Sequence, residues 1–241
     1  MPRPGGACSC YLVKSRNAAV LFDIGSGSAG KLRLAVDYTD LDAILITHMH
    51  ADHFFDLVPL RYALKYGERR ADRLPLWLPP GGCDALDALR RAVSVDAPAD
   101  FFDGIFAVRE YEPSEPIMVK DIQLHLRRTR HYVQAYAVRA ECCETSLTYS
   151  ADTAPSDDVV DFARSSSLFL CEAALGLGSE EGERGHSSAW EAGEMAHQAR
   201  VRRLLLTHYP ARDSAQSLVE AAQSRYEGAV SAADDGIKLD I

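Results

Sequence analysis

The stretch ILITHMHADHFFDL, residues 44–57, joins a run of apolar and β-branched residues to a cluster of three histidines and one aspartate. The run predicts a buried strand, and the cluster begins where that strand ends. His48 and His50 are two residues apart on an extended loop and point the same way, while Asp52 and His53 can turn towards a neighbouring point. Imidazole and carboxylate groups are typical zinc ligands, so this spacing indicates two adjacent metal ions.

Further ligands are expected beyond other strand ends, because six residues cannot complete two metal sites. His131 follows IQLHLRRTR, Asp152 follows SLTYSA, and His208 follows RRLLLT. Each alone is as readily a loop residue as a ligand, but three such residues after three predicted strands together indicate a metal centre. His125 lies within a predicted strand and His197 within a predicted helix, so packing or solvent explains both better.

Length and composition predict one globular domain over residues 1–241, since the chain has 47% hydrophobic and 25% charged residues. A net charge of -9 repels polyanions, so no long nucleic acid partner is expected. No apolar run reaches the roughly 18 residues needed to cross a bilayer, and no secretion signal opens the chain. The six cysteines match no zinc-ribbon or thioredoxin spacing, and we expect reduced thiols and a location in the cytoplasm.

Strand-type and helix-type segments interleave along the chain, which predicts an α/β fold that stacks sheets between helices. The expected helices are at 54–67, 83–95, 155–166, 187–201 and 213–228. The expected strands are at 8–15, 17–27, 40–48, 74–82, 135–142, 145–152, 168–173 and 202–210, with one more closing the chain. Residues 100–113 are expected to pass from a loop into a strand, and residues 117–131 to form a pair of strand segments.

At the level of motifs, the sequence resembles the metallo-β-lactamase superfamily, whose signature H-x-H-x-D-H stands here at residues 48–53. The match is closest to the ribonuclease Z-like and cyclic nucleotide phosphodiesterase-like branch. TRHYVQAYAVR is similar to its third-histidine segment, YSADT to its bridging-aspartate segment and LLLTHYP to its last-histidine segment. The resemblance implies an αββα sandwich of two mixed β-sheets flanked by helices.

The same resemblance implies a zinc-dependent hydrolase with two zinc ions, manganese being an alternative, and with Asp152 as the bridging carboxylate. Asp52 counts both as a ligand and as a catalytic residue. In LFDIGSG, Asp23 would orient ligands, although a buried aspartate that caps a turn is an equal alternative. The implied ligands are His48, His50, His131 and Asp152 for the first metal, and Asp52, His53, Asp152 and His208 for the second.

Two further segments resemble ribonuclease Z motifs: FLCEAA and RGHSSAWEAGEMA. They imply His186 as the general acid that protonates the leaving alkoxide, and Glu172 as the carboxylate that orients it. The chain departs from the family pattern at Cys171 and Ala174, which replace a histidine and a threonine, and at Ser188, which replaces a threonine. A phosphodiester needs a protonated leaving oxygen more than a strained lactam does, so the His186–Glu172 pair favours phosphodiester cleavage.

The expected substrate is a small phosphodiester. Asp152 follows His131 by only 21 residues, so the long basic arm with which related enzymes grip tRNA is absent. A cyclic nucleotide is the leading specific candidate, hydrolysed by metal-bound hydroxide. The alternatives are a ribonuclease Z-like endonuclease acting on short RNA, another hydrolase of the same fold, and a metal-binding protein without turnover. The apolar segment FFDLVPLRYAL could support a homodimer, although a core-facing helix explains it better.

Overall fold

The computed structural model describes residues 4–67, 70–96 and 98–241. Within them the chain forms two compact units. We call them the N-terminal unit (Ala7–Glu112 with Val119–Asp121) and the C-terminal unit (Pro113–Met118 with Ile122–Ile241, together with the first residues up to Gly6). No helix in the described part of the chain is long and apolar enough to cross a membrane.

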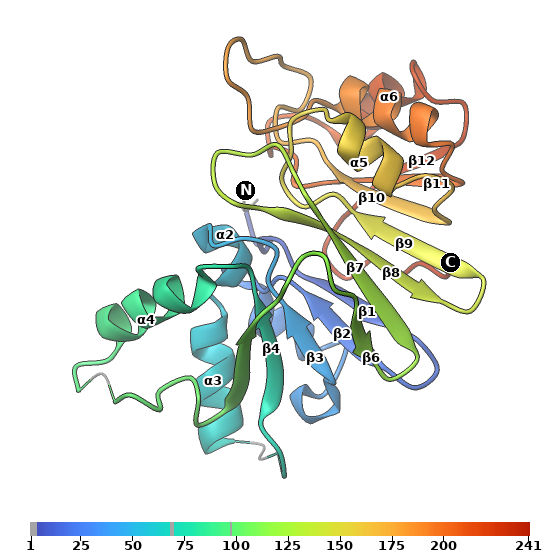
Figure 1. Ribbon diagram of the computed structural model, residues 1–241. Helices are drawn as coiled ribbons and strands as arrows, with labels where there is room; N and C mark the ends of the chain where they lie inside the picture. Colours follow the sequence, from blue (N-terminus) through green and yellow to red (C-terminus); the bar gives the residue numbers. More distant parts are fainter. Residues whose placement is uncertain (1–3, 68–69, 97) are drawn as a thin grey trace. The chain divides into compact units, whose positions relative to one another are not determined.

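The N-terminal unit is built on a five-stranded sheet in the order β1-β2-β3-β4-β5. β1 and β2 pair antiparallel, and the remaining neighbours pair parallel. The helices α3 and α4 lie alongside this sheet (Figure 1). The elements are β1 (Tyr11–Lys14), β2 (Ala19–Phe22), α1 (Ser28–Leu32), η1 (Tyr38–Asp40), β3 (Ala43–Leu45), α2 (Ala51–Phe54), α3 (Leu57–Tyr66), β4 (Leu74–Leu78), α4 (Gly82–Val93) and β5 (Phe106–Glu110).

The C-terminal unit is built on a seven-stranded mixed sheet in the order β12-β11-β10-β9-β8-β7-β6. The strands from β9 to β12 pair parallel, whereas β7, β8 and β9 pair antiparallel. Helices α5 and α6 lie together beside this sheet (Figure 1). The elements are β6 (Ile117–Val119), β7 (Ile122–Arg128), β8 (Tyr136–Cys142), β9 (Thr145–Tyr149), α5 (Asp157–Phe162), β10 (Leu168–Glu172), α6 (Ala189–Ala199), β11 (Arg203–Thr207), α7 (Ala215–Gln223) and β12 (Ala229–Ala232).

Each sheet is held by its own hydrophobic core. Leu21, Ile44 and Leu76 are buried in the N-terminal unit, and Phe169 and Leu204 in the C-terminal unit. The central strands β2, β3, β10 and β11 are apolar almost throughout, because strands buried on both faces cannot alternate with polar residues. Their carboxyl ends are therefore the places where polar side chains first appear.

The expected strands and helices are present, with one division that the sequence pattern did not predict. The helix expected at 54–67 is α3 alone, and a separate short helix, α2, precedes it. The break falls at Asp56, whose carboxylate accepts a hydrogen bond from the Ala29 amide at 2.8 Å, while its own amide donates to the Ile24 carbonyl at 3.0 Å. Helices α1 and η1 were also not predicted, since they are too short for a periodic pattern.

Candidate metal centre

In the N-terminal unit, the loop between β3 and α2 carries the histidine cluster and is held by Asp23. This residue follows β2, is fully buried and has a left-handed backbone with φ 57°. Its carboxylate accepts hydrogen bonds from the Thr47 amide at 2.8 Å and the Thr47 hydroxyl at 3.0 Å. It also accepts one from His53 Nδ1 at 2.7 Å. Asp23 therefore fixes both the start of the loop and the tautomer of His53, as expected for an orienting carboxylate.

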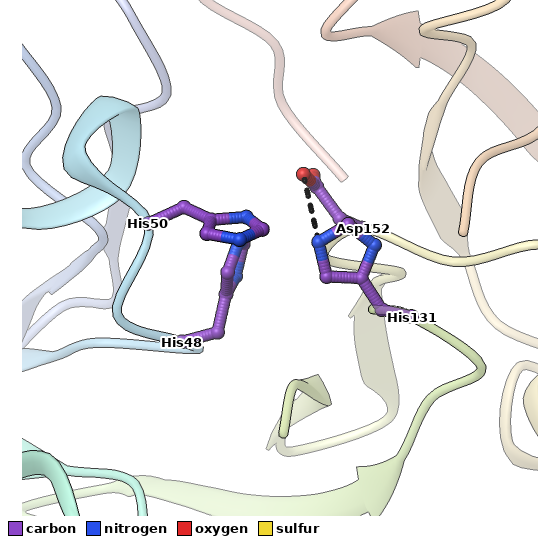
Figure 2. Close-up of side chains that lie close together, drawn as sticks. All are labelled: His48, His50, His131 and Asp152. Atoms are coloured by element: carbon purple, nitrogen blue, oxygen red, sulfur yellow. Dashed lines mark ion pairs between the residues drawn. The ribbon is translucent and has the colours of Figure 1, made fainter. Parts of the chain in front are cut away.

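The imidazoles of this loop are set at short distances from one another. His48 lies with its ring centroid 4.9 Å from that of His50 and 4.0 Å from that of His53. Figure 2 shows His48 and His50 next to each other. The Thr47 hydroxyl gives its proton to Asp23, so His48 Nδ1 is the donor in its 3.1 Å contact with Thr47. With Nδ1 committed in this way, Nε2 is the atom through which His48 would bind a metal.

Close backbone packing positions Asp52 at the start of α2. A Cβ added at Gly25 would lie 1.8 Å from the carbonyl oxygen of Asp52, so only glycine allows this approach. The Ile24 amide donates to the His53 carbonyl at 2.7 Å, which ties the loop after β2 to the same helix. The hydroxyl of Tyr111 donates to the carbonyls on the other side of the loop, at 3.2 Å from both Ile46 and Thr47.

In the C-terminal unit, Asp152 is the centre of a cluster of histidines. Its side chain is 2% exposed, with Oδ1 at 3.4 Å from His208 Nδ1 and Oδ2 at 3.9 Å from His131 Nε2. Figure 2 marks the contact with His131. The Thr129 hydroxyl donates to the Asp152 carbonyl at 2.8 Å, and His131 Nδ1 donates to the Gly185 carbonyl at 2.7 Å. His131 therefore presents Nε2 to the aspartate.

Glu172 and His186 form a second, interlocked pair beside Asp152. Glu172 ends β10 and is fully buried, and its two oxygens accept hydrogen bonds from the amides of Thr153 at 2.9 Å and Ala174 at 2.7 Å. His186 Nδ1 donates to Glu172 Oε1 at 2.9 Å and lies 4.0 Å from Asp152 Oδ2. The carboxylate therefore fixes which nitrogen of His186 faces away from it.

Burial and the interaction between Glu172 and His186 shift the pKa of each residue in opposite directions. Burial raises the pKa of Glu172, and the hydrogen bond with His186 only partly offsets that effect. Burial lowers the pKa of His186, but the hydrogen bond and the charge of Glu172 outweigh it, so the pKa of His186 is raised. Both pKa values of the pair are therefore raised.

The donor set fits divalent metal ions. Within the C-terminal unit, one potential ligand atom each from Asp152, His186 and His208 lies within 4.8 Å of the others. The imidazoles of His48, His53 and His131 each have one nitrogen fixed, by Thr47, Asp23 and Gly185 respectively, as is usual for metal-binding histidines. Nitrogen and carboxylate oxygen donors suit zinc and manganese.

The structure therefore brings the predicted site residues together in two groups, one in each unit. His48, His50, Asp52 and His53 share one loop and the start of α2, and His131, Asp152, Glu172, His186 and His208 gather at the ends of the C-terminal strands. His125 lies in β7 and His197 is exposed on α6, away from this second group, as the sequence predicted.

Sequence reasoning missed Thr47, Tyr111 and Tyr132. Thr47 stands directly before the H-x-H motif, which was the only local signal available. Tyr111 reaches carbonyls 64 and 65 residues away in sequence. The ring of Tyr132 lies 5.7 Å from that of His186. No sequence pattern shows such contacts, because they depend on which strand ends meet.

Two mixed sheets flanked by helices, with His/Asp clusters at their strand ends, define a protein of the metallo-β-lactamase fold that binds divalent metal. The sequence comparisons then narrow this class. Residues 7–226 match the family described as Anti-Pycsar protein Apyc1, and the chain belongs to this family.

Relatives and solved structures agree with this assignment. The chain is 31% identical to the protein ML1173 of Mycobacterium leprae, over 99% of this chain and 84% of that one. It is 27% identical to the probable metallo-hydrolase YhfI of Bacillus subtilis, and the crystal structure of YhfI, described as a metallo-β-lactamase fold protein, superposes with a TM-score of 0.86 over 98% of this chain and 92% of that one. The predicted fold class and superfamily are confirmed.

More distant matches extend to enzymes of the predicted branch. A ribonuclease Z of Picrophilus torridus is 26% identical, over 88% of this chain and 83% of its own length. The fold is also that of unliganded yeast PDE1, with a TM-score of 0.73, 13% identity and coverage of 97% of this chain and 95% of that one.

Proposed function

We propose that this protein is a binuclear metal-dependent phosphodiesterase that hydrolyses a small phosphodiester, with a cyclic nucleotide as the leading candidate. The observation that carries the proposal is the His186–Glu172 pair beside Asp152 in the C-terminal unit, joined by a hydrogen bond of 2.9 Å. A protonated imidazole at this place suits a reaction whose leaving group is an alkoxide. The probable metallo-hydrolase and ribonuclease Z relatives support hydrolase chemistry.

Two zinc ions are the proposed metals, with manganese as the alternative. On the strength of the sequence motifs, Asp152 would be a ligand of both. Divalent ions bound there would supply hydroxide near neutral pH and offset negative charge on the phosphate. The ligands would be His48, His50, His131 and Asp152 for one ion, and Asp52, His53, Asp152 and His208 for the other.

Residues of the chain would orient the metal ligands and supply the proton for the leaving group. Asp23 and Thr47 keep His53 and His48 in the tautomers that present Nε2. Glu172 holds His186 through Nδ1, so Nε2 of His186 carries the proton that passes to the leaving oxygen. Asp52 would act in catalysis through the metal that it holds.

A small substrate is favoured over tRNA by two features of the chain. The segment from His131 to Asp152 contains only the β8–β9 hairpin, and the net charge of -9 offers no general attraction to a polyanion. The ribonuclease Z relatives support an endonuclease that acts on short RNA as the second candidate. A protein that binds metal without turnover is the third.

One panel of assays separates these candidates. Purified protein would be analysed for bound metal and then given cyclic AMP, cyclic GMP, 2′,3′-cyclic nucleotides, a tRNA precursor and bis(p-nitrophenyl) phosphate. We expect about two metal ions per chain and turnover of a cyclic nucleotide. Cleavage of the tRNA precursor alone would favour the endonuclease, and bound metal without any hydrolysis would favour the binding protein.

His186 is tested by replacement with alanine, and His197, exposed on α6, provides the matched control. We expect His186→Ala to lower kcat about 10²- to 10⁴-fold with unchanged metal content, the usual range for loss of a general acid. His197→Ala should change neither. An unchanged kcat in His186→Ala would remove this residue from the mechanism. Location in the cytoplasm and formation of a homodimer stay predictions from the sequence.

A further inference from the structure

Tyr132 presents an aromatic surface next to the histidines of the C-terminal unit. It follows His131 directly in the chain, and 52% of its surface is exposed. Its ring centroid lies 5.2 Å from that of His131 and 5.7 Å from that of His186. A large, half-exposed aromatic ring is thus available to a ligand whose phosphate lies among these imidazoles.

The ring is held in place from two sides. Its hydroxyl donates to the carboxylate of Glu180, at 3.0 Å from either oxygen. One side of the ring rests against Gly185, where an added Cβ would lie 2.5 Å from Cε2 and 2.6 Å from Cδ2. Any larger residue at position 185 would push the ring away. An aromatic side chain fixed in this way loses little conformational entropy when a flat group stacks on it.

We propose that Tyr132 is a stacking platform for the nucleobase and thereby determines specificity for nucleotides. This inference rests on the proposed function, in which the phosphate of a cyclic nucleotide is cleaved beside His131 and His186. A phosphodiester alone would gain nothing from an exposed aromatic ring, whereas every nucleobase offers a π-face. Because stacking tolerates different bases, Tyr132 separates nucleotides from other phosphodiesters more than it separates one base from another.

The test compares a substrate that has a base with one that lacks it. Tyr132→Leu and Tyr132→Phe would be assayed with 3′,5′-cyclic AMP and with a methyl riboside 3′,5′-cyclic phosphate. Tyr66→Leu is the matched control, since Tyr66 is 71% exposed on α3 of the N-terminal unit. Circular dichroism and thermal unfolding would establish that each variant is folded.

We expect Tyr132→Leu to raise KM for cyclic AMP about 5- to 150-fold, the usual range for loss of one stacked base, and to leave KM for the base-free substrate unchanged. Tyr132→Phe keeps the ring and should behave like wild type, as should Tyr66→Leu. The proposed platform is overturned if Tyr132→Leu changes KM for both substrates equally or for neither. It is also overturned if Tyr132→Phe raises KM as much as Tyr132→Leu does, because the effect would then come from the hydroxyl and Glu180. A wild-type protein that hydrolyses no cyclic nucleotide would overturn the proposed function and the platform together, whereas an active wild type with an unaffected Tyr132→Leu variant overturns the platform alone.

Discussion

Replacing Glu172 with glutamine tests whether this buried carboxylate is ionised and holds the C-terminal cluster together. Its two oxygens accept the amides of Thr153 and Ala174, and one of them also accepts Nδ1 of His186. A glutamine has one acceptor oxygen and one NH₂ group, so one of the two amides must face another donor. An unsatisfied buried donor costs about 1–3 kcal/mol, and the bond from His186 would lose the part of its strength that comes from charge.

We therefore expect Glu172→Gln to lower the free energy of unfolding by about 2–4 kcal/mol. In a chain of this length, the loss corresponds to a fall in Tm of roughly 5–15 °C. Urea unfolding followed by circular dichroism at neutral pH measures the first quantity, and calorimetry measures the second. Glu220→Gln is the control, because Glu220 is exposed on α7 and its carboxylate accepts a hydrogen bond from the exposed side chain of Gln216.

A loss below about 1 kcal/mol in Glu172→Gln, equal to that of the control, would refute this reasoning. It would mean that Glu172 already carries a proton at neutral pH, since a glutamine then resembles the native group. Burial does raise the pKa of Glu172, so this outcome is a real alternative. The hydrogen bond with His186 would in that case be a bond between neutral partners, and the proposed proton donor would lack its anionic support.

Three other substitutions test the framework around the site. Gly25→Ala should lower the free energy of unfolding by about 2–3 kcal/mol, measured by thermal unfolding, and should reduce bound metal, because the new Cβ would overlap the Asp52 carbonyl. Tyr111→Phe should lower the free energy of unfolding by about 1 kcal/mol, measured in urea, since it removes the hydroxyl that donates to the carbonyls of the histidine loop. In Glu191, burial raises the pKa, but the hydrogen bonds from Arg184 and from the amide and hydroxyl of Ser188 together outweigh burial, so the pKa is held below 4.5. Its contribution to stability is therefore present above pH 4.5 and lost as the pH falls through the lowered pKa, and Glu191→Gln should flatten that part of a plot of stability against pH.

The sequence was most informative where the chemistry is local. The H-x-H-x-D-H cluster lies within six residues, so its loop and its ligand character could be predicted from spacing alone. Apolar runs predicted the strands that end at Leu45, Glu172 and Thr207, because buried parallel strands need continuous apolar residues. The ends of these strands then gave the places at which to look for further ligands.

Contacts between distant segments could not be predicted in this way. The short helix α2 separates from α3 because Asp56 bonds to backbone groups near residues 24 and 29, which no helical period reveals. Tyr132 meets Glu180 across 48 residues, and Tyr111 meets Ile46 across 65. Such contacts follow from the order of strands in each sheet. That order depends on tertiary packing and not on local propensity.

His53 and His186 have the same hydrogen-bond arrangement but differ in solvent exposure. Both donate Nδ1 to a fully buried carboxylate, of Asp23 and Glu172 respectively. The His53 side chain is 0% exposed, whereas that of His186 is 21% exposed. Burial from solvent favours a metal ligand, because water then cannot compete for the metal. A proton donor, in contrast, must regain its proton from solvent after each turnover.

On this difference we propose that His53 binds metal and that His186 transfers a proton. His186 also lies close enough to Asp152 and His208 to act as a third ligand. The two roles separate by metal content. If His186 were a ligand, His186→Ala would bind less metal and lose thermal stability when metal is limiting. If it is the proton donor, the variant binds metal like wild type and loses only turnover, and the loss is smaller for a substrate such as bis(p-nitrophenyl) phosphate, whose leaving group needs no proton.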